Sequence, residues 1–124
     1  MTTVVDASVV LAWLQDEPGA DEAEPLLMDG VIGAANWAEV LQKTRQHGAP
    51  PGIVGRLLAS FGLTVVDVKV ADAEIAADLW RQGTALTLAD RLCLGLGLRM
   101  GSPVATADAA WAEVEEGPAL VLIR

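Results

Sequence analysis

The sequence predicts an α/β protein in which helices cover both faces of a central, mostly parallel sheet. Short apolar segments that suit buried strands alternate with segments of helical periodicity along the whole chain. Hydrophobic residues make up 52% of the 124 residues and charged residues only 20%, which is the composition of a protein with a large core. No repeat, low-complexity tract or linker interrupts the pattern, so we expect one domain over residues 1–124.

The first half of the chain is expected to contain two strands and three helices. They are, in order, the strand Val4–Val5, the helix Ala7–Leu14, the helix Ala20–Met28, the strand Val31–Gly33 and the helix Asn36–Gln46. Pro18 and Gly19 end the first helix, and Pro25 makes the second helix irregular because proline lacks a backbone N–H. His47 and Gly48 form the C-terminal end of the third helix.

The second half continues the alternation. It contains, in order, the helix Ile53–Phe61, the strand Thr64–Val68, the helices Ala71–Gln82 and Leu88–Met100, the strand Pro103–Thr106, the helix Ala109–Val114 and the strand Leu120–Ile123. The run at 64–68 is β-branched, which favours a strand. The segment 88–100 is apolar nearly all round, as a buried helix is. The tryptophans fall in helical apolar stripes and are expected to pack: Trp13, Trp37, Trp80 and Trp111.

Composition also limits the classes of function. The single cysteine, Cys93, excludes an internal disulfide and argues against a cysteine-based zinc site, as expected in the cytoplasm. The N-terminus lacks the basic start of a signal peptide, and no apolar run has membrane-spanning length. The net charge of −9 argues against binding phosphates through a general positive field, so a nucleic-acid partner would require bound cations or a local basic strip.

Four acids follow strands or open helices in comparable settings: Asp6, Glu39, Asp90 and Asp108. In an α/β fold such positions can converge on one crevice at the edge of the sheet. Two carboxylates ~4 Å apart repel by about 4 kcal/mol at an effective dielectric of 20, so a cluster persists only with a shared proton or a cation. Carboxylate oxygens are the ligands that Mg²⁺ or Mn²⁺ prefers.

Each acid also has an ordinary structural explanation. The pairs Asn36–Glu39 and Thr87–Asp90 have the spacing of capping boxes, and Asp6 or Asp108 could cap a helix N-terminus. The two interpretations are compatible, because the dipole at a helix N-terminus favours the same anions.

Four segments carry a family resemblance: Val5-Asp6-Ala7-Ser8, Asn36-Trp37-Ala38-Glu39-Val40, Leu88-Ala89-Asp90-Arg91-Leu92-Cys93-Leu94 and Thr106-Ala107-Asp108-Ala109-Ala110-Trp111. In this order and spacing they resemble the signature blocks of PIN domains, above all the VapC-type toxins of prokaryotic toxin–antitoxin pairs. The resemblance implies a three-layer α/β/α sandwich and a Mg²⁺- or Mn²⁺-dependent ribonuclease. It also implies a homodimer and an antitoxin whose tail occupies the active site.

The resemblance and the chemistry together suggest roles for individual residues. The four acids would be the catalytic metal ligands, and the cation would activate a water molecule for hydrolysis of a phosphodiester bond in single-stranded or looped RNA. Ser8 and Thr106 could orient ligands or water, or simply bond to the backbone at strand ends. Lys43, Arg45 and Arg91 are candidate contacts to RNA phosphates, although Lys43 suits a surface ion pair with the acid one turn before it.

Two other classes remain open from sequence. A phosphoacceptor domain also places an aspartate after its first strand, but it expects a second nearby acid and a lysine after a late strand, and no lysine follows Lys69. A non-catalytic PIN-like scaffold would be favoured by loss of the acids, and all four are present.

Overall fold

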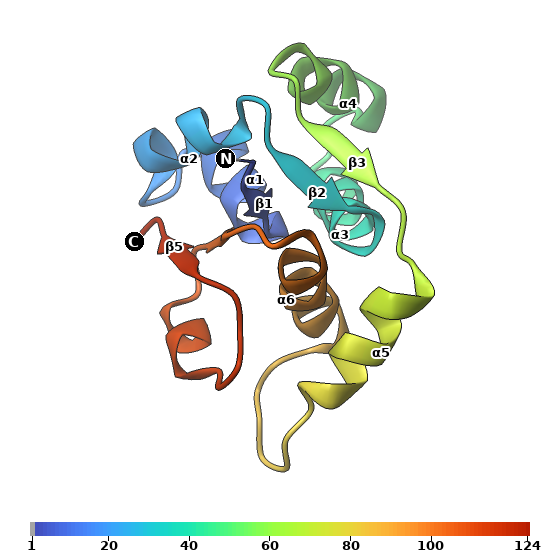
Figure 1. The fold of residues 1–124 in the computed structure, drawn as a ribbon. Coiled ribbons are helices and arrows are strands. Elements are labelled where there is room, and N and C mark those ends of the chain that lie inside the picture. The colour runs from blue at the N-terminus through green and yellow to red at the C-terminus, as the bar shows by residue number, and fades with distance from the viewer. Residues whose placement is uncertain (1) are drawn as a thin grey trace.

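The computed structural model describes residues 2–124, and within them five strands form one sheet in which every neighbouring pair is parallel (Figure 1). The strands are β1 (Val4–Val5), β2 (Val31–Gly33), β3 (Thr64–Val66), β4 (Val104–Thr106) and β5 (Leu120–Leu122). Their order across the sheet is β3-β2-β1-β4-β5. The predicted parallel sheet is confirmed.

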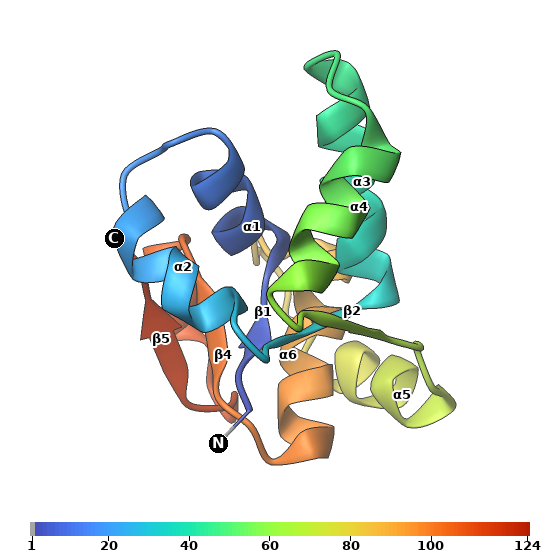
Figure 2. The same ribbon diagram turned by 90° about the horizontal axis from the view of Figure 1, so that it is seen from above.

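The helices lie on both faces of this sheet (Figures 1 and 2). They are α1 (Ala7–Leu14), α2 (Ala20–Leu27), α3 (Ala34–Gln46), α4 (Pro51–Ser60), α5 (Val70–Asp78), α6 (Leu88–Met100) and the short 3₁₀ helix η1 (Ala109–Glu113). Helices α1 to α4 cover one face, and α5, α6 and η1 cover the other. The paired α3 and α4 extend beyond the sheet (Figure 2).

Alternation along the short strands creates two separate cores. Val5, Ile32 and Ala105 point into the core beneath α1 to α4, whereas their neighbours belong to the core beneath α5, α6 and η1. Because successive strand side chains point to opposite faces, a sheet covered on both sides needs apolar residues at every position. The predicted three-layer α/β/α sandwich follows from this pattern and is confirmed.

Two predicted elements end earlier than expected by two or more residues. Strand β3 stops at Val66 because its partner β2 ends at Gly33, which lies opposite Val66 in the register, so residues 67 and 68 have no strand to pair with. Helix α5 stops at Asp78 rather than Gln82, because the Arg81 guanidinium caps it by donating to the carbonyls of Asp78 (2.6 Å) and Trp80 (2.8 Å).

The early end of α5 makes one packing prediction wrong. Trp80 lies beyond the helix and is 52% exposed. The other tryptophans contact apolar cores as predicted: Trp111 is buried, Trp37 is partly buried, and the Trp13 ring meets Phe61 edge-on at a centroid distance of 5.0 Å. Over residues 2–124, no helix combines the length and the apolar character that crossing a membrane requires.

Candidate active site

The strand order has its switch point between β1 and β4. The chain winds outward from β1 through β2 to β3, and then returns to place β4 on the other side of β1. In open α/β sheets, ligands bind outside the carboxyl ends of the strands at such a switch point. Asp6 directly follows β1, and Thr106 ends β4 beside it.

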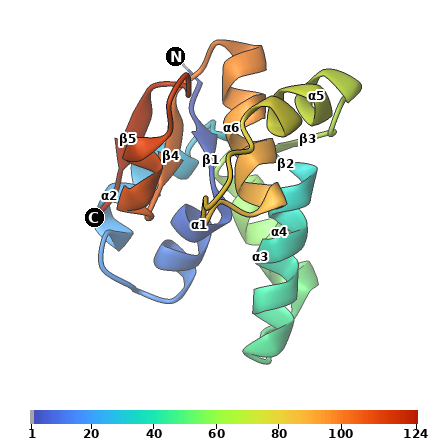
Figure 3. The ribbon, with the colours of Figure 1, turned by 90° about the horizontal axis from the view of Figure 1, so that it is seen from below.

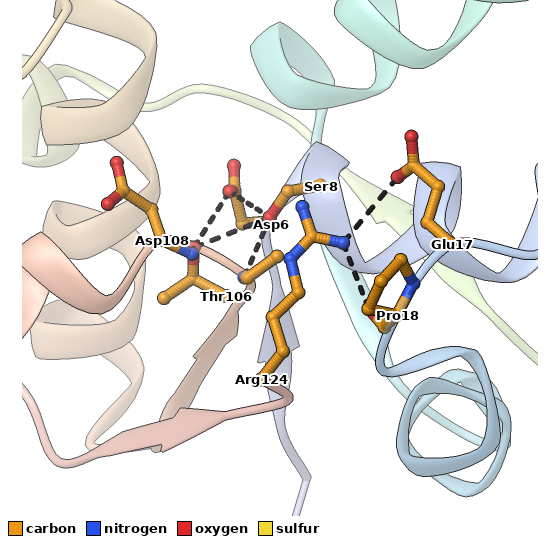
Figure 4. A network of polar contacts seen from close by, with 8 residues as sticks. Asp6, Ser8, Glu17, Pro18, Thr106, Asp108 and Arg124 are labelled. Atoms are coloured by element: carbon orange, nitrogen blue, oxygen red, sulfur yellow. Dashed lines mark hydrogen bonds and ion pairs between the residues drawn. The ribbon is translucent and has the colours of Figure 1, made fainter.

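Two hydroxyl groups fix the Asp6 carboxylate at this point. Ser8 Oγ donates to Asp6 Oδ2 at 2.7 Å, and Thr106 Oγ1 donates to the same oxygen at 3.0 Å (Figure 4). Each hydroxyl also accepts a backbone N–H, from Ala107 to Ser8 (2.9 Å) and from Asp108 to Thr106 (3.1 Å). Because those N–H groups can only donate, both hydroxyl protons are directed at Asp6. Both hydroxyls therefore contact the Asp6 carboxylate and also bond to the backbone at the strand end.

Glu39 reaches the site from α3, and its setting differs from the expected capping box. Helix α3 begins at Ala34 with Gly33 as its N-cap residue, so Asn36 already lies inside the first turn. The Asn36 amide nitrogen donates to Glu39 Oε1 at 3.2 Å and to the Ala89 carbonyl of α6 at 3.2 Å. The capping interpretation of Asn36 is wrong, because the side chain bridges two helices rather than closing one.

Asp90 is the third acid at this edge, and it does form the predicted capping box. The Thr87 N–H donates to Asp90 Oδ2 at 2.9 Å, and the Asp90 N–H donates to Thr87 Oγ1 at 3.1 Å. These bonds hold the carboxylate at the start of α6, where the helix dipole favours a negative charge.

Electrostatics couples Asp6, Glu39 and Asp90. Burial raises the pKa of Asp6, hydrogen bonds from Ser8 and Thr106 oppose the rise, and the Asp90 charge adds to it. Burial likewise raises the pKa of Glu39, and the charges of Asp6 and Asp90 raise it further. The same three carboxylates, after burial itself, raise the pKa of the fully buried Cys93 thiol, which is therefore a protonated core residue as predicted.

Asp108 stands apart from the other three acids. It is exposed, and its Oδ1 accepts the N–H of Ala110 at 3.0 Å, which is the predicted N-cap. It lines a cavity of about 540 Å³ together with Leu79, Arg81, Leu86 and other residues between the end of α5 and η1. Asp108 thus lies between the carboxyl end of β4 and this cavity.

The donor chemistry of the four acids fits a hard cation, although their side chains are not drawn together. Across residues 2–124, no three histidine, cysteine or carboxylate side chains are gathered closely enough to hold a metal ion. One oxygen of each of Glu39, Asp90 and Asp108 is engaged locally, and no hydrogen bond within this range engages the other. Each carboxylate therefore keeps an oxygen that a cation can bind.

The candidate RNA contacts lie in different surroundings. Lys43 is exposed on α3. Its positive charge partly opposes the rise in the pKa of Glu39, so Lys43 lies close to the acids. Arg45 is exposed in the last turn of the same helix. Arg91 instead donates through Nη1 to the Ala76 carbonyl at 2.8 Å, and its buried Nε has no partner within residues 2–124, so it ties α6 to α5.

Two residues at the carboxyl ends of the strands differ from or were absent from the sequence prediction. Asn36, expected to cap α3, instead bridges α3 and α6. Arg124, two residues after the end of β5, donates to the Pro18 carbonyl at 2.9 Å, and its Nη1 lies 3.7 Å from a Glu17 carboxylate oxygen (Figure 4). The signal for Arg124 in the sequence is its position just beyond the last strand. Because β5 is parallel to β4, the two strands end at the same edge of the sheet.

Comparison with known proteins agrees with this geometry. The model of the family described as PIN domain matches residues 3–117. The fold is similar to a toxin–antitoxin complex from Klebsiella pneumoniae, with a TM-score of 0.78, 18% identity, and coverage of 99% of this chain and 98% of that chain. No match is found among curated proteins.

Two further solved structures share the fold. DNA-bound VapBC from Salmonella typhimurium gives a TM-score of 0.74 and 17% identity, covering 100% of this chain and 99% of that chain. VapC20 of Mycobacterium tuberculosis, a sarcin–ricin loop cleaving toxin, gives a TM-score of 0.74 and 11% identity, covering 92% and 95%. The family match spans the segments that hold all four acids, and these solved structures share the fold of the chain. The chain belongs to the PIN-domain family.

Proposed function

We propose that the protein is a Mg²⁺- or Mn²⁺-dependent endoribonuclease that acts as the toxin of a toxin–antitoxin pair in the cytoplasm. The observation that carries the proposal is the electrostatic coupling of Asp6, Glu39 and Asp90 at the switch point of a parallel sheet. The raised pKa values of Asp6 and Glu39 and the repulsion among the three carboxylates favour a bound cation, because a cation relieves both effects.

Asp6, Glu39, Asp90 and Asp108 would hold the ion through oxygens that their local hydrogen bonds leave unengaged. When bound, the ion supplies an activated water molecule and neutralises charge on the scissile phosphate. Ser8 and Thr106 would hold Asp6 in place and oppose the rise in its pKa, since both hydroxyls donate to Oδ2.

The substrate we propose is single-stranded or looped RNA. An acidic protein has little long-range attraction for phosphate, so contacts must be short-range. Lys43, whose charge acts on Glu39, and Arg45, in the last turn of the same helix, are exposed and suit such contacts, whereas the contacts of Arg91 bind it to α5. The backbone of unpaired RNA can approach the acids without the deformation that a stiff duplex would require.

Metal binding provides the direct test. Calorimetry with Mn²⁺ is expected to show binding to the wild type at millimolar ion or below, and the melting temperature is expected to rise because the ion binds only the native state. EDTA is expected to stop RNA cleavage, and added Mg²⁺ to restore it. Absence of heat with the wild type, or cleavage that persists in EDTA, would overturn the proposal. Asp67→Asn, an exposed acid beyond β3, is the control and should bind Mn²⁺ like the wild type.

We also propose a homodimer and a partner antitoxin. Similar structures include toxin–antitoxin complexes, and large apolar side chains remain exposed on α4 (Ile53, Leu57), just before α5 (Val68) and at its first residue (Val70). The net charge of −9 suits a basic segment of the antitoxin by complementarity.

Light scattering at roughly tens of micromolar protein is expected to report a dimer. Purification from the native host is expected to yield a small basic protein bound in stoichiometric amount. A monomer at that concentration would contradict the dimer, and purification of the chain alone would contradict the antitoxin.

A further inference from the structure

Asn36 is among the most deeply buried polar side chains of the described chain, and it lies between two of the acids. It is 1% exposed, and α3 and α6 pack against each other at this level (Figure 3). Its amide nitrogen reaches Glu39 Oε1 and the carbonyl of Ala89, the residue before Asp90. One side chain thus connects the acid of α3 to the backbone that carries the acid of α6.

The orientation of this amide is fixed by its partners. A carboxylate oxygen and a backbone carbonyl can only accept, so the NH₂ group must face both of them and a flipped amide would leave both unsatisfied. Both hydrogens of the Asn36 amide are therefore used. Burying such a group without partners is unfavourable, so these two bonds decide where the side chain can sit.

We propose that Asn36 is the positioning residue of the candidate metal centre. It orients the Glu39 carboxylate and sets the separation between Glu39 and Asp90, by holding the first turn of α3 to the first turn of α6. The inference rests on the proposed function, because it assigns a role towards the ion that these carboxylates would bind. Residues that orient ligands in this way typically contribute 10–100-fold to metal affinity.

Packing alone does not require an amide at this position. The N-cap residue of α3 is Gly33, and an apolar side chain at residue 36 would fill the space between the helices without burying polar atoms. The only acceptors that the amide serves are the Glu39 carboxylate and the backbone next to Asp90. The chemistry of the contact therefore points to the acids rather than to the helix interface.

The experiment compares Mn²⁺ binding by calorimetry in Asn36→Ala, Asn36→Ser and a matched control. Thr44→Val is that control: Thr44 is also buried on α3, and its hydroxyl donates to the Val40 carbonyl at 2.7 Å, away from the acids. We expect Asn36→Ala to weaken Mn²⁺ binding about 10-fold or more, Asn36→Ser to recover part of the loss, and Thr44→Val to bind like the wild type. In RNA cleavage, kcat should fall in Asn36→Ala while KM stays unchanged.

A double-mutant cycle then separates positioning from simple destabilisation. If Asn36 acts through Glu39, adding Asn36→Ala to Glu39→Gln weakens Mn²⁺ binding by much less than it does in the wild type. Equal losses in both backgrounds, or Mn²⁺ affinity that is unchanged in both Asn36 variants, would overturn the inference. If the wild type itself binds no Mn²⁺, the proposed function fails instead. Should Asn36→Ala not fold, Asn36→Ser in the same cycle decides the question.

Discussion

Asp90→Asn is expected to reduce RNA cleavage by about 100-fold or more while leaving the circular dichroism spectrum unchanged. Loss of a residue that only orients a ligand already costs up to about 100-fold, and this change removes a ligand charge. The fold survives because the asparagine carbonyl oxygen can still accept the Thr87 N–H, so the capping box at the start of α6 is retained. The measurement is cleavage of an end-labelled RNA hairpin in Mg²⁺.

Two comparisons make this result decisive. Asp67→Asn removes one exposed acid without touching the site, so it should cleave like the wild type. Cleavage by Asp90→Asn at the wild-type rate would show that the activity belongs to a contaminant or that the mechanism is wrong.

Asp6→Asn should lose cleavage to a similar extent, yet remain at least as stable as the wild type in EDTA at neutral pH. Burial raises the pKa of Asp6 above its ordinary value of 3.8, so the ionised carboxylate destabilises the metal-free fold. A raised pKa means that the native state takes up the proton first, so this penalty is relieved as the pH falls through the raised value. The asparagine variant has no such charge, and its free energy of unfolding should lack this part of the pH dependence.

Asp72→Ala is expected to lower the free energy of unfolding by about 3 kcal/mol, which corresponds to a melting temperature lower by on the order of 10 °C. Asp72 is 2% exposed and accepts hydrogen bonds from the Arg99 guanidinium at both carboxylate oxygens. It also accepts the Lys69 N–H at 2.9 Å, which caps α5. Removing the carboxylate leaves the Arg99 charge without its partner between α5 and α6.

The pH dependence of this variant has the opposite sign to that of Asp6. Burial alone would raise the pKa of Asp72, but the bonds from Arg99 and Lys69 outweigh it and lower the pKa. Asp72 therefore stabilises the wild type at neutral pH, and that contribution is lost as the pH falls through the lowered value. The deficit of Asp72→Ala should shrink in acid. Asp78→Ala, an exposed acid on the same helix, is the control and should unfold like the wild type.

Local sequence patterns predicted most element boundaries correctly. The segments 7–14, 31–33 and 88–100 have the predicted bounds, because apolar periodicity and turn residues act within a few positions. The deviations arise where distant or side-chain contacts intervene. Strand β3 is limited by the length of β2, and α5 is ended by the Arg81 side chain, which left Trp80 exposed.

The sequence by itself determined which residues are candidate ligands, since Asp6, Asp90 and Asp108 stand at element ends that local rules identify and Glu39 lies near the start of a predicted helix. Only the tertiary structure decided how they meet. Strand pairing is non-local, so β1 can lie between β2 and β4 without any local signal, and the hydrogen bond from Thr106 to Asp6 joins residues 100 positions apart. The role of Asn36 was likewise decided only by the tertiary structure. An asparagine three residues before a glutamate can either cap one helix or bridge two helices. The carbonyl that distinguishes them belongs to Ala89, 53 positions away.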